Sequence, residues 1–324
     1  MTIKLFSEPF SLPPLLAWYE ANKRDLPWRH STNPYHLWMS EIMLQQTQVV
    51  TVLPRYAAWL AAFPTITALA EADEDEVMKA WEGLGYYRRA RYAHAAAKQI
   101  MVQHGGVFPR AFDDILALPG IGRSTAGAIA SFAFGDAYPV LDGNVQRVLH
   151  RYFGASKNQQ QWQQAETMIK QSKSPALWNQ AMMELGATCC HRSKPSCVNC
   201  PMQQQCLSAF QTITPMVTKN KIKVRDVYWQ VQCYGDPLDE KIWLVRRPNR
   251  GIWGGLWSPP IDESYQQGEK RPTLVHTLTH RRLHLYGACM QCPPPAAEGA
   301  WFLLTKLPAL PTGIRRLLAI MLLE

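Results

Sequence analysis

A glycine-rich turn followed by a run of small residues is the feature that most constrains how this chain can fold. The turn is Leu118-Pro-Gly-Ile-Gly, and the run of small residues extends from Ser124 to Ala130. Glycine adopts backbone conformations that other residues avoid, and it lets the backbone approach a ligand closely. The pattern predicts a tight turn that leads into a helix and offers backbone amides to a phosphate.

A single carboxylate follows further along, in the segment Leu141-Asp142-Gly143-Asn144-Val145. Asparagine is a favoured N-terminal cap of helices, so we expect Asn144 to cap a helix that contains the basic residue Arg147. The stretch from Leu118 to Val148 therefore combines an anion-binding turn with Asp142, a candidate catalytic acid.

The apolar spacing changes about two-thirds of the way along the 324 residues, which indicates two domains. Residues 1–211 carry apolar side chains mostly at helical spacing, so we expect an all-α domain there. Residues 212–225 are polar and basic, as in a linker, and residues 226–324 are predicted to form a smaller α+β domain. Its predicted strands are Val227–Tyr234, Ile242–Arg246, Thr273–Leu278, Leu283–Met290 and Ala300–Leu304, and a closing helix starts near Thr312.

The net charge of +9 and the pI near 9.2 favour a polyanionic partner, although an acidic membrane surface would also attract a basic face. No apolar run approaches the roughly 20 residues that span a bilayer. Residues 1–13 lack the pattern of a secretory signal, so we expect a cytoplasmic, nucleoid-associated protein. In that reducing compartment, clustered cysteines indicate metal binding rather than disulfides.

Four cysteines are spaced C-x6-C-x2-C-x5-C, at Cys190, Cys197, Cys200 and Cys206. Four thiolates from one short loop suit either a tetrahedral zinc ion or an iron–sulfur cube, and the spacing alone does not separate the two. A metal held by four cysteines keeps no open position for a substrate, which favours a structural role. We expect the neighbouring Cys189 to pack in the core rather than bind the metal.

Glu41 is the only acid in the helical run from Tyr35 to Thr47, and many of its neighbours are aromatic or apolar. Desolvation there would raise its pKa toward the range useful for a general acid. Periodicity alone, however, favours a solvent-facing glutamate. Gln45 and Gln46 follow, and their amides could read base edges or fill a vacated place in a base stack, although exposed glutamines usually do neither.

Several motifs occur together in this chain: SEIMLQQTQV, GLGYYRRAR, LPGIGRSTAGAI, LDGNVQRV, NQAMMELG and the four-cysteine loop. As a set they resemble the helix-hairpin-helix DNA glycosylases of the endonuclease III superfamily, and more closely the MutY-type adenine glycosylases. The resemblance is dense from Leu26 to Leu207 and looser from Arg225 to Leu285. Taken singly, LPGIG is a general motif for binding the DNA backbone.

The resemblance implies a monomeric enzyme of base excision repair that hydrolyses the N-glycosidic bond of adenine mispaired with 8-oxoguanine or guanine in double-stranded DNA. The adenine would be flipped into a pocket, at a cost that is smallest for a poorly paired base. It further implies a 4Fe–4S cluster on the cysteine loop, and a hairpin from Leu118 to Ala130 that grips phosphates. The DNA-binding residues of this region would be Gly120, Gly122, Ser124, Thr125 and, beside the lesion, Gln46.

By the same resemblance, Glu41 protonates the adenine ring, while Asp142 stabilises the oxocarbenium-like sugar and helps to deliver water. Two acids with separate tasks also fit the general logic of glycosidic hydrolysis. The supporting pocket residues would be Asn144, Tyr86, Tyr87, Leu26, Trp28 and Arg29.

Ser124 occupies the position at which strand-cutting relatives carry a lysine. A Schiff base requires an amine, which a serine hydroxyl cannot supply, so we expect base removal without efficient strand cleavage. Two alternatives remain: an endonuclease III-like glycosylase with lyase activity, which Ser124 and the second domain disfavour, and a catalytically silent DNA-damage-binding protein. The presence of both Glu41 and Asp142 argues against the silent protein.

The segment RRPNRGIWGGLWSPP, residues 246–260, resembles the MutT-like, Nudix-type domain with which these glycosylases sense 8-oxoguanine. The run of glutamates that would hold magnesium for nucleotide hydrolysis does not follow it. Leu278, Thr279 and His280 stand where the family carries a Phe-Ser-His loop that contacts the lesion. The hydroxyl and the histidine are retained, but the aromatic wedge is lost, which predicts weaker or differently built discrimination.

Overall fold

The computed structural model describes residues 12–154, 157–211, 224–236, 240–267, 271–290 and 298–321. The chain divides into two compact units, each assembled from separate stretches of sequence. The first contains Met1–Leu60, Thr65–Ala70 and Ala95–Val217, and the second contains Ala61–Pro64, Glu71–His94 and Thr218–Glu324. Most of the predicted linker lies outside the described residues. Within the described residues, no helix has both the length and the apolar character needed to cross a bilayer.

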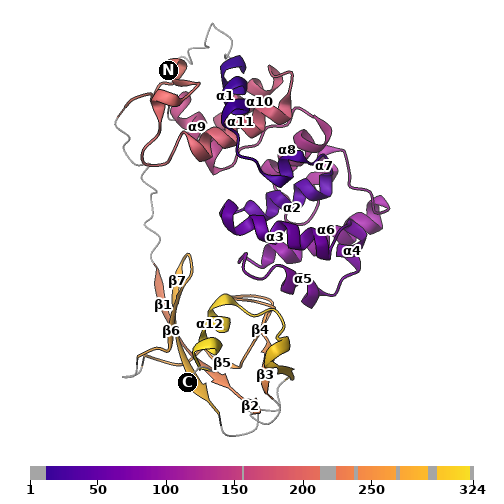
Figure 1. Cartoon of the computed structure of the whole chain (residues 1–324), viewed down its shortest axis with the longest axis vertical. Helices are drawn as coiled ribbons and strands as arrows, with labels where there is room; N and C mark the ends of the chain where they lie inside the picture. Colours follow the sequence, from indigo (N-terminus) through magenta and orange to yellow (C-terminus); the bar gives the residue numbers. More distant parts are fainter. Residues whose placement is uncertain are drawn as a thin grey trace. The chain divides into compact units, whose positions relative to one another are not determined.

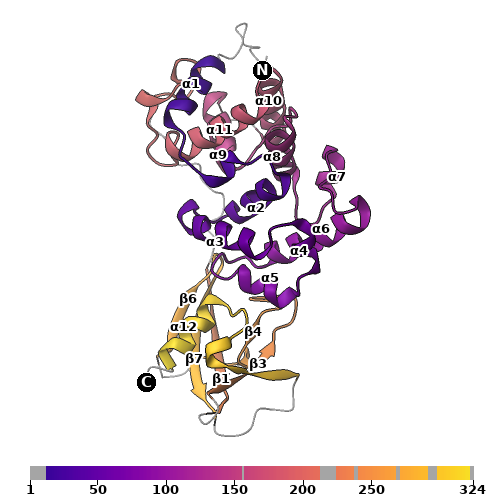
Figure 2. The ribbon, with the colours of Figure 1, turned by 45° about the vertical axis from the view of Figure 1, so that its right-hand side comes forward.

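The first unit is helical, as its apolar spacing predicts, and α1, α9, α10 and α11 gather in one group in both views (Figures 1 and 2). Its elements are α1 (Leu12–Asn22), η1 (Pro27–His30), α2 (Pro34–Leu44), most of α3 (Val49–Ala62), most of α4 (Ile66–Glu71), the end of α6 (Arg88–His104), α7 (Phe112–Leu116), α8 (Arg123–Phe134), α9 (Gly143–Tyr152), α10 (Asn158–Lys170), α11 (Pro175–Thr188), η2 (Cys197–Asn199) and η3 (Gln203–Gln205).

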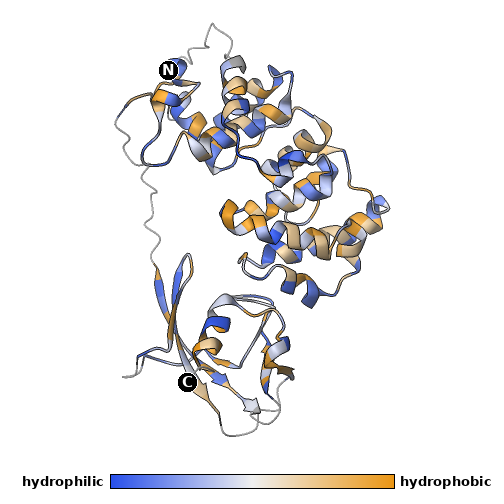
Figure 3. Ribbon diagram, viewed as in Figure 1, coloured by the Kyte–Doolittle hydropathy of each residue, from blue (hydrophilic) through white to orange (hydrophobic). Residues whose placement is uncertain are grey.

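Hydrophobic and hydrophilic residues interleave along these helices (Figure 3), and many of the apolar side chains are buried. One buried cluster joins Tyr19 of α1, Leu149 of α9, Ile169 of α10 and Trp178 of α11. Burial of large side chains such as these stabilises a fold by about 1.5–3 kcal/mol each. Side chains of α9 and α11 are part of this core, which holds the two helices together.

The second unit contains the predicted α+β domain, whose strands form two mostly antiparallel sheets. One sheet has the order β5-β1-β7-β6, in which β1 and β7 are parallel; in the other, β3 pairs with β2, β4 and β8. The helix α12 packs against the first sheet and shares its core. The elements are β1 (Arg225–Cys233), β2 (Gly235–Asp236), β3 (Lys241–Arg246), β4 (Trp257–Ser258), β5 (Ile261–Asp262), β6 (Leu274–Thr277), β7 (Arg281–Cys289), β8 (Gly299–Leu303), η4 (Leu304–Lys306) and α12 (Thr312–Met321).

The second unit also includes α5 (Glu74–Ala80) and the start of α6, although both come from the first half of the sequence. Polar contacts join this segment to the α+β domain. The Asp75 carboxylate accepts from Arg246 at 2.6 Å, Lys79 donates to the Leu307 carbonyl at 3.1 Å, and the Arg91 guanidinium donates to the Gly254 carbonyl. Residues 71–94 therefore form part of the same compact body as the carboxy-terminal domain.

Candidate active site

Glu41 lies on α2, among the buried side chains of Trp38, Ile42 and Met43. Burial, together with a smaller contribution from the negative charge of Asp142, raises the pKa of its carboxyl group from 4.5 to about 8. Glu41 is half-buried rather than fully solvent-facing, and its raised pKa favours the neutral carboxylic acid at physiological pH. The influence of Asp142 also means that the two carboxyl groups, a hundred residues apart in sequence, lie near each other.

Asp142 is the N-cap of α9, so the prediction that Asn144 caps this helix is wrong. Its Oδ1 accepts from the backbone N–H groups of Asn144 and Val145, at 2.9 and 2.8 Å. A cap stands outside the helix it closes, whereas Asn144 already lies in the first turn. Burial raises the pKa of Asp142, and these hydrogen bonds counteract part of the rise. Because the cap occupies Oδ1, Oδ2 is the oxygen left with only a long contact, 3.4 Å from the Asn144 amide nitrogen.

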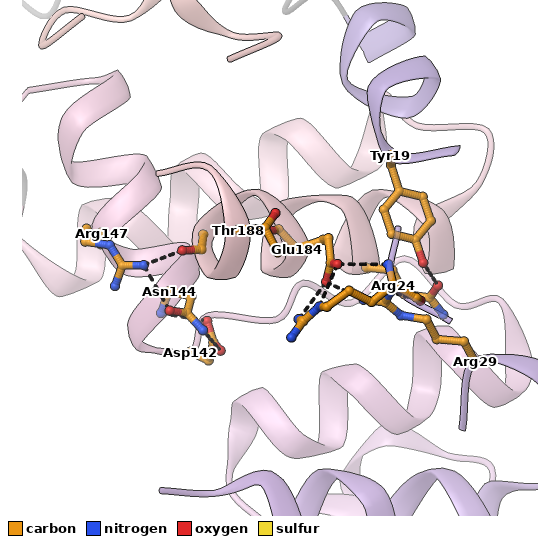
Figure 4. A network of polar contacts seen from close by, with 10 residues as sticks. Tyr19, Arg24, Arg29, Asp142, Asn144, Arg147, Glu184 and Thr188 are labelled. Carbon is orange, nitrogen blue, oxygen red and sulfur yellow. Dashed lines mark hydrogen bonds and ion pairs between the residues drawn. The ribbon is translucent and has the colours of Figure 1, made fainter. Parts of the chain in front are cut away.

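Arg147 connects the start of α9 to the end of α11 (Figure 4), and it also contacts the cysteine loop. Its guanidinium donates to the Asn144 side-chain oxygen at 2.9 Å and to the Gly186 carbonyl at 2.6 Å, and its Nε donates to the Cys190 carbonyl at 2.9 Å. Gly186 allows α11 to pack closely against the first turn of α9, since a Cβ at position 186 would lie only 2.6 Å from the Cβ of Asn144. Asn144 is thus held from two sides.

The sequence analysis did not single out Glu184, a fully buried carboxylate on α11 (Figure 4). Arg24 donates to it through two nitrogens, each at 2.8 Å, and Arg29 donates at 2.6 Å. Burial raises the pKa of Glu184, but the hydrogen bonds from the two arginines more than offset that, and its pKa falls to about 2. The only available signal was an acid within the apolar run NQAMMELG, and nothing local indicated partners about 160 residues away.

Three of the predicted pocket residues, Leu26, Trp28 and Arg29, lie in one segment of the first unit, and Arg29 takes part in this ion pair. Leu26 and Trp28 are buried, and the Trp28 ring meets Tyr56 edge-on at a centroid distance of 5.4 Å. Arg29, the third residue of this group, binds Glu184 as described above. The segment from Leu26 to Arg29 is therefore fixed by apolar packing and by a charge on α11.

Five of the predicted residues lie in the second unit: Tyr86, Tyr87, Leu278, Thr279 and His280. Tyr86 has a half-exposed side chain and a positive φ of 46°, and its hydroxyl lies 2.7 Å from that of Thr279. Tyr87 is buried, with its hydroxyl donating to the Leu310 carbonyl at 3.4 Å. Leu278 packs partly against the domain core, whereas Thr279 and His280 are exposed.

The glycine-rich turn forms as predicted, with Gly120 at a φ of 78° and Gly122 immediately before α8. Ser124 accepts a hydrogen bond from the Leu141 backbone N–H at 3.1 Å, and Thr125 accepts one from the Gln45 amide at 3.3 Å. Gln46 is exposed and has a φ of 57°. A non-glycine residue in this left-handed region is uncommon, and such conformations concentrate at functional sites.

The four cysteines of the C-x6-C-x2-C-x5-C loop line one pocket, together with Cys189. Cys189 is also part of the buried helical core, as predicted. Among the described residues, no three Cys, His, Asp or Glu side chains gather closely enough to hold a single metal ion. Four thiols around one pocket fit a metal or cluster held by cysteines.

Comparisons with known proteins agree with this architecture. Residues 39–174 match the model of the HhH-GPD superfamily base excision DNA repair proteins, and residues 237–319 match the NUDIX domain. The adenine DNA glycosylase of Buchnera aphidicola (subsp. Baizongia pistaciae) is 38% identical over 259 residues, or 76% of this chain and 72% of that one. That of subsp. Acyrthosiphon pisum is 36% identical, covering 86% of each chain. The human adenine DNA glycosylase is 45% identical over 208 residues, or 59% of this chain and 38% of that one.

Solved structures show the same fold for the helical part. A thermostable thymine-DNA glycosylase superposes with a TM-score of 0.57 at 29% identity, covering 60% of this chain and 93% of that one. Endonuclease III in a non-covalent DNA complex superposes with a TM-score of 0.53 at 21% identity, covering 60% and 92%. The predicted all-α glycosylase fold with a Nudix-type domain is confirmed.

Proposed function

Since the chain belongs to the adenine DNA glycosylase family, within the HhH-GPD superfamily, and is therefore a DNA N-glycosylase, we propose that it removes adenine mispaired with 8-oxoguanine or guanine. The main support is the pair formed by Glu41 and Asp142, two carboxyl groups in one helical unit with different environments. Such a difference lets one group act as an acid while the other acts as an anion.

Glu41 is protonated at neutral pH because its pKa is about 8, so it can donate a proton to the ring of the flipped adenine. Protonation turns the base into a better leaving group and weakens its bond to the sugar. Asp142 then faces a sugar that gains positive charge as the bond breaks. Its oxygen Oδ2, free of the cap, would stabilise that charge and orient the attacking water.

This division of labour predicts a pH profile for base release. We expect the rate to be constant near neutrality and to fall roughly tenfold per pH unit above about 8, as the acid form of Glu41 disappears. Single-turnover rates measured between pH 6 and pH 10 would check this. A rate that keeps rising through pH 9 would contradict the role of Glu41 as the proton donor.

Ser124 predicts a second property, base removal without efficient strand cleavage. Its hydroxyl accepts from Leu141 and offers no amine for a Schiff base. We expect strand breaks only after alkali treatment, and no borohydride-trapped crosslink beyond a trace. A crosslink formed through a lysine of the helical unit as fast as adenine is released would contradict this prediction. Ser124→Lys, which supplies the missing amine, is the positive control for trapping.

We infer that Cys190, Cys197, Cys200 and Cys206 hold a 4Fe–4S cluster. Bound there, the cluster would cross-link the loop that follows α11, with no position open to the substrate. Burial raises the pKa of the Cys190 thiol, and Arg151, whose guanidinium donates to the Cys190 sulfur at 3.2 Å, counteracts part of that rise. Iron and acid-labile sulfide near four of each per chain are expected, whereas one zinc per chain would contradict the assignment.

In the DNA strand opposite the adenine, Thr279 and His280 would contact 8-oxoguanine. Gln46 would lie in the base stack. The exposed side chains of Thr279 and His280 and the positive φ of Gln46 support this arrangement. Leu278 differs, since it packs partly into the domain core. Because the hydroxyl of Thr279 cannot replace an aromatic wedge, we infer that discrimination of the lesion is weaker or differently built in this protein.

The deciding experiment uses one duplex with adenine opposite 8-oxoguanine and matched duplexes with adenine opposite guanine or thymine. The proposed enzyme releases free adenine from the first two and leaves the A:T duplex intact. If no adenine appears from either mispair, the proposed substrate is wrong; tight binding without release would instead indicate a damage-binding protein.

A further inference from the structure

The segment that carries Asp142 into the site has no regular secondary structure of its own. Residues 136–141 connect α8 to α9 without helix or strand. Such backbone must find its hydrogen-bond partners elsewhere, and catalysis needs the carboxylate held to within a fraction of an ångström. The contacts of this connection therefore decide where Asp142 stands.

Asn179 supplies two of these contacts, both from α11. It lies on α11 with no exposed surface, and its Oδ1 accepts from the Val140 N–H at 2.8 Å. Its amide nitrogen donates to the Tyr138 carbonyl at 2.9 Å and to the Ser131 hydroxyl at 2.8 Å. The orientation of the amide is unambiguous, since Val140 can only donate and the Tyr138 carbonyl can only accept.

The connection is held from α8 as well. Ser124 accepts from the Leu141 N–H, and Gly127 lies so close that a Cβ added there would be 2.5 Å from the Pro139 carbonyl oxygen. Backbone groups at positions 138, 140 and 141 are thus bonded to side chains of two helices. Asp142 follows directly, and its own cap fixes the residues after it.

We propose that Asn179 is a positioning residue for Asp142, and that it acts by binding the 138–140 backbone to α11. Asn179 does not touch the substrate in this scheme. The inference rests on the proposed role of Asp142 in base release, but the binding of the connection can be tested separately from the reaction.

The test compares Asn179→Ala with Ser131→Ala and Gly127→Ala in the full-length protein. Asn179→Ala removes both bonds to the connection, and a displacement of the carboxylate by about 1 Å is expected to slow base release on the order of 10²-fold. Ser131→Ala removes the contact between Asn179 and α8, together with the bond from Ser131 to the Ala128 carbonyl, but leaves both bonds to the connection in place. Its rate should therefore stay within about threefold of wild type. Gly127→Ala pushes the same connection from the other side and should also slow the reaction, even if Asn179→Ala folds poorly.

Two readouts separate positioning from general destabilisation. Affinity for a duplex with a non-hydrolysable adenine nucleotide should be nearly unchanged in Asn179→Ala. The alkaline limb of its pH profile should move to lower pH, because a displaced Asp142 raises the pKa of Glu41 less. Equal slowing in Asn179→Ala and Ser131→Ala, or loss of affinity in proportion to loss of rate, would overturn the proposal.

Hydrogen exchange distinguishes this inference from the assignment of the substrate. Asn179→Ala should speed exchange at the amides of Val140 and Leu141 relative to Ser131→Ala, whichever base the enzyme removes. Faster exchange with no adenine release by wild type would refute only the substrate, whereas unchanged exchange in Asn179→Ala would refute the role of Asn179.

Discussion

Replacing Glu41 by glutamine is expected to slow adenine release from an A:8-oxoguanine duplex by about 10³-fold, within the range that general acid catalysis contributes. Glutamine has nearly the same size and cannot donate the proton, so binding of the duplex should change little. The measurement is the single-turnover rate constant beside the dissociation constant. Glu71→Gln, an exposed substitution of the same kind, should match wild type.

The same substitution should not destabilise the protein at alkaline pH. The folded pKa of Glu41, about 8, exceeds its ordinary value of 4.5, so the unfolded chain loses the proton first. The contribution of Glu41 to the free energy of unfolding is therefore fully present below about pH 4.5, and it decreases as the pH rises toward 8. Glu41→Gln removes that penalty, so its melting temperature at pH 8 should equal or exceed that of wild type. An unfolded Glu41→Gln protein, or one that releases adenine at the normal rate, would contradict our account of Glu41.

Glu184→Gln is expected to lower the free energy of unfolding by about 3 kcal/mol at pH 7, because it leaves two arginines without their counter-ion. The pKa shift of Glu184 from 4.5 to about 2 corresponds to a similar value. Since that pKa is lowered by folding, the contribution is complete above about pH 4.5 and is lost as the pH falls toward 2. Urea unfolding at pH 7 and at pH 3 should therefore show a large and a smaller difference.

Glu166→Gln is the matched control for this experiment. Glu166 also pairs with an arginine, Arg123, but both side chains are more than a third exposed. Exposed pairs contribute at most about 1 kcal/mol. If Glu184→Gln and Glu166→Gln lower the free energy of unfolding equally, the burial of Glu184 has no special role in stability.

The secondary structure could largely be predicted from the sequence, because its signals are local. Strands such as β1 and β7, and the helix that starts at Thr312, follow from apolar spacing and from the Gly and Pro residues between them. The cap of α9 was assigned to the wrong residue, because Asp142 and Asn144 are both good caps and only the backbone geometry decides between them.

The candidate site was harder to predict, because its partners meet through packing. Glu41 and Asp142 were identified by their motifs, but nothing in the local pattern paired Glu184 with Arg24 or gave Asn179 its three partners. Those contacts depend on how α11 packs against α1 and α8, which a periodicity argument does not specify. Their roles in the reaction remain predictions for the experiments above.

The discontinuous second unit bears on how such a protein can be rearranged by gene fusion or truncation. The sequence suggests that the chain could be divided at the linker without loss of contacts. Such a cut would, however, separate Lys79 from the Leu307 carbonyl and Arg91 from the Gly254 carbonyl. It would also leave Asp75 without Arg246. A shortened gene would therefore encode a helical domain whose residues 71–94 had lost their neighbours. The sequence modules that recombination could exchange do not coincide with the compact units of the structure, and a new partner for either half would have to recreate those contacts.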